Sequence, residues 1–171
     1  GMEDRTITIN SISKTYSVTG WRVGWAIASP QITKRIRKVH DFLTVGAPCP
    51  LQHAAVAALN FPLNYYDSLQ NKYLEKRKLL YNTLLETGFD PYLPKGAYYI
   101  MTDITRLMDK VGINDDFNFS KKLIELTKVA TVPGFSFYSD KKNGRNQIRF
   151  TFCKKDETLF EVKNLLDRLK R

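Results

Sequence analysis

The sequence predicts an α/β or mixed α+β fold, and three observations indicate it. Short segments that alternate apolar and polar residues, as strands do, are separated by longer segments with apolar residues at every third or fourth position, as in amphipathic helices. The 171 residues include 43% hydrophobic side chains, enough for a substantial core. No internal repeat or low-complexity tract interrupts the pattern. A length of 171 residues allows one complete domain or parts of two.

Two strands are expected near the start of the chain. Residues 6–10 alternate like a strand, and residues 21–28 indicate a second strand that is largely buried. Between them, residues 11–20 form a polar loop rich in hydroxyl side chains.

Three helices are predicted next. The first begins at Pro30 and carries an apolar stripe at spacings of four, three and four residues, while four basic residues lie around it. The second is a short, alanine-rich helix at residues 50–59. The third, at residues 63–86, is the longest, and Gly88 stands where a left-handed C-terminal cap is expected.

The remaining chain is predicted to alternate strands and helices. The expected elements are a strand at residues 97–103, a helix at 116–128, a short strand at 129–132, a loop at 133–146, a strand at 147–153 and a last helix carrying Leu159, Val162, Leu166 and Leu169. The predicted order is thus β-β-α-α-α-β-α-β-β-α.

Composition excludes several classes of protein. The longest uninterrupted apolar run, residues 54–59, is far shorter than the roughly 20 residues that a membrane-spanning helix needs. Cys49 and Cys153 form no CxxC motif, and His40 and His53 lack partners at metal-ligand spacing, so no metal site is predicted. With no export leader indicated, we expect a cytoplasmic protein.

Residues 11–24 hold the most informative group of polar side chains. In an extended backbone the hydroxyls of Ser11 and Ser13 face the same way, and Arg22 could present its fork of donors to the same phosphate. Lys14 would then stand at the edge of that phosphate, and a neutral amine is a nucleophile. Spacing alone leaves open that Lys14 is an ordinary solvated loop residue.

The string Ser-Ile-Ser-Lys-Thr-Tyr-Ser-Val-Thr-Gly-Trp-Arg-Val-Gly at these positions resembles the cofactor-lysine segment of class I/II aminotransferases. The resemblance implies the pyridoxal-phosphate-dependent transferase fold of type I. It implies that Lys14 forms a Schiff base with pyridoxal 5'-phosphate, and that Ser11 and Arg22 bind the cofactor phosphate.

The resemblance extends toward the C-terminus. Residues 132–134 and 147–152 resemble the small-domain segment whose arginine holds the substrate α-carboxylate, a role that falls on Arg149. Strand alternation places Arg149 opposite the apolar face formed by its neighbours, toward a polar cleft or solvent. Without the resemblance, a surface arginine is an equally good interpretation.

Two further stretches resemble the broad-specificity branch that includes kynurenine and methionine aminotransferases. They are residues 44–48 together with Gln52, and residues 94–99. The resemblance implies amino acid and 2-oxo acid substrates.

The whole chain resembles the C-terminal portion of such an enzyme. This implies that residues 1–61 are a remnant of the large cofactor-binding domain and residues 62–171 the mixed α+β small domain. The family's phosphate loop and the carboxylate that contacts the pyridine nitrogen would lie outside this portion. We therefore expect weak or absent cofactor binding, negligible turnover by the chain alone, and association with itself or with a missing N-terminal half.

An alternative interpretation is a basic interaction module that binds a partner polypeptide or a polyanion. Lysine and arginine total 27 against 17 acidic residues, which gives a formal charge of +10. However, no nucleic-acid-binding motif accompanies the basic residues, so nucleic acid is the less favoured partner.

Overall fold

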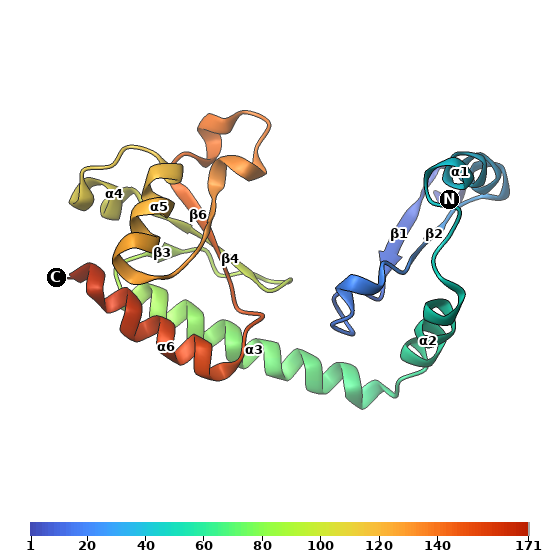
Figure 1. Cartoon of the computed structure of the whole chain (residues 1–171), viewed down its shortest axis with the longest axis horizontal. Helices are drawn as coiled ribbons and strands as arrows, with labels where there is room; N and C mark the ends of the chain where they lie inside the picture. Colours follow the sequence, from blue (N-terminus) through green and yellow to red (C-terminus); the bar gives the residue numbers. More distant parts are fainter. Residues whose placement is uncertain (171) are drawn as a thin grey trace. The chain divides into compact units, whose positions relative to one another are not determined.

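The computed structural model describes residues 1–170 and divides the chain into two compact units, Gly1–Tyr65 and Tyr66–Arg171. The division falls within the first turn of the longest helix, α3 (Leu63–Glu86), which Figure 1 shows in green. The predicted assignment of residues 1–61 to a large-domain remnant and of 62–171 to a small domain stays a prediction. Arg171, the last residue of that range, lies outside the described residues.

The first unit consists of a two-stranded antiparallel sheet followed by helices. Ser11 pairs with Gly24 at one end of the sheet, and Thr8 pairs with Ile27 at the other. A small core of Ile12, Val23 and Ala55 lies beside the sheet. The elements are β1 (Thr8–Ser11), β2 (Gly24–Ile27), α1 (Pro30–Leu43), α2 (Cys49–Leu59) and the short 3-10 helices η1 (Glu3–Arg5) and η2 (Thr19–Trp21).

The prediction that residues 21–28 form a largely buried strand is wrong. The regular strand is restricted to β2, where Trp25 is half-buried and Ile27 is 61% exposed. The physical reason is that β2 pairs only with β1 among the described residues, and the small core of this unit covers Val23 and part of Trp25 but not Ile27. An apolar strand is buried only where another element packs on its face, and the strand's own sequence does not show whether such an element is present.

The second unit contains a four-stranded antiparallel sheet in the order β3-β4-β6-β5. In the centre of the sheet, Met101 of β4 pairs with Arg149 of β6, and Val132 of β5 pairs with Arg149 from the other side. The elements are β3 (Asp90–Pro91), β4 (Tyr99–Asp103), α4 (Thr105–Val111), α5 (Asp116–Thr127), β5 (Val132–Pro133), β6 (Gln147–Thr151), α6 (Asp156–Leu166) and the 3-10 helices η3 (Gly134–Phe137), η4 (Lys141–Gly144) and η5 (Asp167–Lys170).

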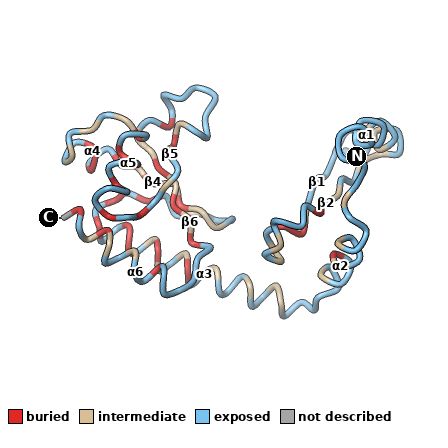
Figure 2. Tube along the Cα trace, in the orientation of Figure 1, coloured by how far each residue is buried: buried red, intermediate tan, exposed pale blue. Residues whose placement is uncertain are grey.

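Apolar packing of helices against this sheet forms the main core. Figure 2 shows buried residues along β4 and β6 and on one side of the helices. The residues with almost no exposed surface include Leu84, Ile100, Phe119, Ile148 and Phe152. Helix α6 runs alongside α3 (Figure 1), and the ion pairs Lys76–Asp156 and Lys163–Glu86 connect the two helices.

Most predicted elements are confirmed, including the first strand and the alanine-rich helix, but some short elements are not. Helix α3 has the predicted bounds, and Gly88 has a φ of +93°, as expected of a left-handed cap. The sequence analysis missed β3 and α4, and the strand expected at residues 129–132 is only the two-residue β5. A two-residue strand and a seven-residue helix contain too few apolar residues to show the spacing that distinguishes a strand from a helix.

Asp115 caps the N-terminus of α5 by accepting a hydrogen bond from the Asn118 N–H at 2.8 Å. This backbone bond holds the pKa of Asp115 below its ordinary value. A lowered folded-state pKa contributes stability above the unfolded value of about 3.9, and that stability is lost as pH falls through the lower folded-state value.

We therefore expect Asp115→Ala to lower the free energy of unfolding at pH 7 by about 1 kcal/mol, the usual value of an N-cap. The deficit should shrink as the pH falls from about 4 through the lower folded-state pKa of Asp115, because the wild-type carboxyl loses its charge over this range. Asp115→Asn serves as the control, since it can still accept the bond but has no charge to titrate. Urea denaturation at several pH values measures both, and a deficit that is independent of pH would contradict the prediction.

Candidate functional site

The loop between β1 and β2 holds three of the four predicted site residues. Ser11 is the last residue of β1, Lys14 lies at the exposed turn after it, and Arg22 precedes β2 in the left-handed conformation with a φ of +55°. Because Ser11 pairs with Gly24, both stems of this loop begin at the same end of the sheet. The predicted phosphate-binding pair thus belongs to one local structure.

A series of hydrogen bonds connects Ser11 to Arg22 through the loop. The Ser13 N–H donates to Ser11 Oγ at 3.4 Å, and Thr19 Oγ1 donates to the Ser13 carbonyl at 3.1 Å. Arg22 Nη1 then donates to the Thr19 carbonyl at 2.9 Å. Since a guanidinium has five N–H donors, this bond orients Arg22 and leaves further donors for an anion.

Apolar and aromatic contacts hold the backbone on both sides of Lys14. Ile12 is completely buried, and its N–H donates to the Val23 carbonyl at 3.4 Å. The Tyr16 ring stacks on that of Tyr65 with centroids 5.8 Å apart, and the Tyr65 hydroxyl donates to the Thr15 carbonyl at 2.8 Å. Lys14 is therefore an exposed side chain on a fixed backbone.

Gly24 permits the close approach of β1 and β2 where the loop begins. A Cβ atom at Gly24 would lie 2.8 Å from the Asn10 carbonyl oxygen and 3.2 Å from Ser11 Cβ. Only glycine fits such a close backbone contact without moving the strand that ends in Ser11.

Arg149, the fourth predicted residue, belongs to the other unit. It lies in the middle of β6, half-buried, on the face opposite the buried Ile148 and Phe150. This orientation is the one that the alternation predicts. Its guanidinium carbon lies 3.9 Å from the centroid of the Tyr99 ring and 4.5 Å from that of Phe137.

Sequence reasoning missed Tyr99 and Phe137 as neighbours of Arg149. Tyr99 lies on the same face of the sheet as Met101, the β4 partner of Arg149, so alternation could have found it once the register was known. Phe137 lies in η3, a short 3-10 helix without a usable period.

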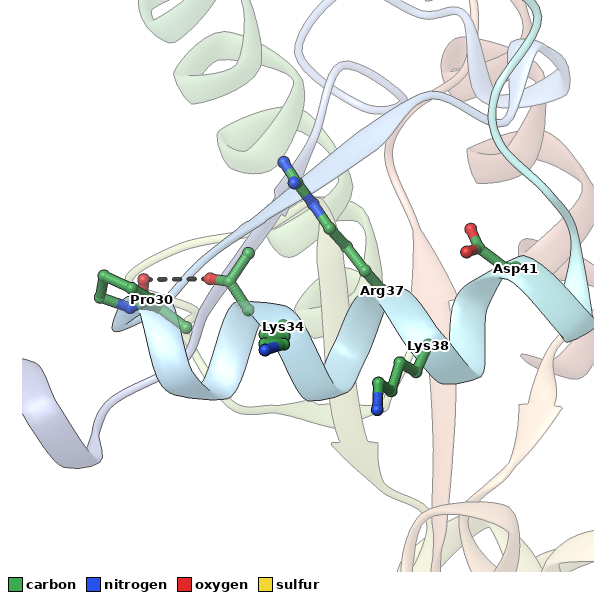
Figure 3. A pocket seen from close by; sticks show the side chains of 7 residues that line it. Pro30, Lys34, Arg37, Lys38 and Asp41 are labelled. Atoms are coloured by element: carbon green, nitrogen blue, oxygen red, sulfur yellow. Dashed lines mark hydrogen bonds between the residues drawn. The ribbon is translucent and has the colours of Figure 1, made fainter.

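A separate groove of about 530 Å³ lies along α1 and is lined mainly by charged residues. Figure 3 shows Arg37 and Asp41 extending from one side of the helix and Lys38 from the other. None of the four predicted site residues lines this groove. The full lining is Ala28, Pro30, Thr33, Lys34, Arg37, Lys38 and Asp41.

Residues 1–170 contain neither a cluster of metal-binding side chains nor a membrane-spanning helix. Within this range, no three His, Cys, Asp or Glu side chains gather in a way that could hold a metal ion. Over the same part of the chain, no helix combines the length and the apolar character needed to cross a bilayer.

Comparison with known proteins identifies the family. The profile of the family described as "Aminotransferase class I and II" matches residues 1–169. The chain belongs to this family. Its members are in general pyridoxal-phosphate-dependent aminotransferases, and the match confirms the predicted resemblance to this family.

Individual relatives agree with this assignment. A kynurenine–oxoglutarate transaminase from Dictyostelium discoideum is 37% identical over 100% of this chain and 43% of its own length. A methionine aminotransferase from Escherichia coli is 32% identical over 98% of this chain and 42% of its own length. The chain thus spans about two fifths of the length of these relatives, so it corresponds to part of an aminotransferase.

Solved structures confirm the predicted fold class. The structure of N-succinyldiaminopimelate aminotransferase from Mycobacterium tuberculosis matches 99% of this chain with a TM-score of 0.90 and 32% sequence identity. The match covers 43% of that protein. The chain therefore has part of the aminotransferase fold.

Proposed function

We propose that this chain carries the cofactor-attachment and phosphate-binding part of an aminotransferase site. Lys14 is the attachment point for pyridoxal 5'-phosphate, and Ser11 and Arg22 hold the phosphate. The observation that carries the proposal is the hydrogen-bonded loop that joins Ser11 to Arg22 beside Lys14. Its hydroxyl, guanidinium and primary amine are the groups that a phosphate ester bearing an aldehyde requires.

When bound, pyridoxal 5'-phosphate supplies an electron sink that stabilises negative charge at the substrate Cα. The residues of this chain would bind the reactants and carry protons. Lys14 Nζ would hold the proton that moves to or from the substrate Cα, because its amine is the base on this loop. Arg149 would bind the substrate α-carboxylate with two parallel N–H donors.

The substrates proposed for the intact site are an amino acid and a 2-oxo acid. Relatives named for kynurenine, oxoglutarate and methionine support this class. We expect negligible turnover from these 171 residues by themselves, since they span about two fifths of the relatives' length. We also propose a cytoplasmic location, which the small number of cysteines favours.

The absorbance spectrum with pyridoxal 5'-phosphate tests the proposal directly. At a large excess of pyridoxal 5'-phosphate, we expect the wild-type chain to give a weak band that is absent from Lys14→Ala. Borohydride reduction followed by peptide mass mapping should locate the label on Lys14. Lys34→Ala is the matched control, because it removes another exposed lysine of the same unit and should keep the band. Equal bands from all three proteins would refute the role of Lys14.

We also propose that the first unit associates, either with a second copy or with the N-terminal portion of the family fold. Large apolar side chains there are strongly exposed, including Phe42 at 94% and Ile9 at 79%. Exposed apolar surface of this extent and an unpaired strand edge both favour association. Light scattering should show a dimer or larger species at micromolar concentration. A monomer that remains monomeric with added N-terminal portion would contradict the proposal.

The groove on α1 supports the alternative function, a basic module that binds a polyanion. Lys34, Arg37 and Lys38 line it together with a single acidic residue, Asp41. Such binding would weaken steeply as salt rises. A fluorescent oligonucleotide or heparin probe that shows no salt-dependent binding would exclude this alternative.

A further inference from the structure

Arg149 packs against two aromatic rings that come from different parts of the second unit. The Tyr99 ring belongs to β4, and the Phe137 ring belongs to η3, the short helix that follows β5. The distances of 3.9 Å and 4.5 Å from the guanidinium carbon to the two ring centroids are within the range of favourable cation–π contacts, which extends to about 6 Å. The cation is thus held by two independent elements.

Further contacts hold the Tyr99 ring and the backbone that carries Phe137. The Tyr99 ring lies 4.4 Å from that of Tyr98, which in turn lies 6.2 Å from Tyr73 of α3. The helix that carries Phe137 begins at Gly134, whose backbone touches that of Gly144. The Tyr99 ring is thus packed within a row of aromatic rings, and the helix that carries the 42% exposed Phe137 is held through its backbone.

The kind of contact matters for what Arg149 can still bind. An aromatic ring attracts a guanidinium through its charge and its plane, without using the N–H donors. Among residues 1–170, the ion pairs do not include Arg149. Its in-plane donors are accordingly not committed to an acidic side chain of the described chain.

We propose that Tyr99 and Phe137 are positioning residues that orient the Arg149 guanidinium so that its N–H edge receives a carboxylate. The inference rests on the proposed function, in which Arg149 binds the α-carboxylate of the amino acid or 2-oxo acid. It assigns Tyr99 and Phe137 a role that acts through Arg149 rather than on the substrate. A flexible arginine would lose entropy on binding, and an oriented one loses less.

The test uses the full chain with ¹⁵N-labelled arginine and two measurements. The first is the chemical shift of the Arg149 Nε–Hε group, identified by its loss in Arg149→Lys. We expect ring currents to move it upfield of the exposed Arg168, and Tyr99→Leu or Phe137→Leu to move it back. Tyr99→Phe and Phe137→Tyr should keep the shift, because each retains a ring. Unfolding would change the chemical shifts of all the arginine resonances. Loss of one ring beside Arg149 should change mainly the Arg149 Nε–Hε resonance.

The second measurement is the dissociation constant for 2-oxoglutarate, used as a carboxylate probe. We expect it to rise roughly three- to tenfold in each leucine variant, as the loss of one cation–π contact implies. Tyr92→Leu is the control, since it removes an exposed tyrosine near β4 that does not contact Arg149. The conservative variants should bind like the wild type.

The outcomes distinguish the carboxylate-binding role of Arg149 from the positioning role of Tyr99 and Phe137. If Arg149→Lys binds 2-oxoglutarate as tightly as the wild type, or if the wild type binds none, the carboxylate role of Arg149 fails. If Arg149→Lys loses binding while both leucine variants keep the wild-type affinity and shift, the role of Tyr99 and Phe137 is overturned.

Discussion

Replacing Gly134 with alanine is expected to lower the free energy of unfolding of the second unit by about 3 kcal/mol, at the upper end of the usual cost of overpacking. The added Cβ would lie 2.6 Å from the Gln147 carbonyl oxygen and in contact with the Gly144 carbonyl. Both neighbours are backbone atoms, so neither can rotate away as a side chain could. The strand β6 or the loop before it would have to shift.

Gly96→Ala provides the control for this prediction, because no atom lies within 4 Å of the position that its Cβ would occupy. We expect that variant to unfold within about 0.5 kcal/mol of the wild type. Urea denaturation followed by far-UV circular dichroism measures both. Equal midpoints for the two variants would show that the backbones at Gly134 and Gly144 are less close than described.

Gly134→Ala should also affect the contact between Arg149 and Phe137. Gly134 begins the helix that carries Phe137, and Gln147 begins the strand that carries Arg149. A shift at this contact would therefore separate the guanidinium from one of its rings. The close contact between Gly134 and Gly144 thus links the stability of the second unit to the position of Arg149, the proposed carboxylate-binding residue.

The sequence predicts well those features that depend on long periods or on a dense local motif. Helix α3 combines an extended apolar stripe with a glycine cap, and its bounds agree with the prediction. Ser11, Lys14 and Arg22 lie close together in the sequence, so a single loop with its stems carries all three. The same short stretch carries the resemblance to the aminotransferase family, which the match over residues 1–169 confirms.

What the sequence could not predict depends on partners distant in the chain. The exposure of Ile27 arises because the small core of its unit does not reach that end of β2, which no local sequence pattern predicts. The contact of Arg149 with Tyr99 requires the β4–β6 register, and its contact with Phe137 requires the path of a loop. Each of these depends on tertiary packing rather than on local preference.

The largest loss of stability is expected from Phe152→Ala, which should lower the free energy of unfolding of the second unit by about 4 kcal/mol. Phe152 is 1% exposed, and its ring meets that of Tyr73 on α3 edge-on, with centroids 6.1 Å apart. Alanine would leave a cavity between the end of β6 and the long helix. Because Tyr73 also supports Tyr98, the loss should spread toward the rings beside Arg149.

Phe160→Ala is the matched control, since this phenylalanine of α6 is 61% exposed and its loss should change stability by no more than about 0.5 kcal/mol. Phe152→Leu should fall between the two, because leucine fills part of the space. Thermal and urea unfolding of the three variants give the order directly, and the Arg149 Nε–Hε shift reports whether the rings have moved. A Phe152→Ala protein that is as stable as Phe160→Ala would mean that α3 and the sheet are held together mainly by other contacts, and that the core does not support the aromatic rings around Arg149.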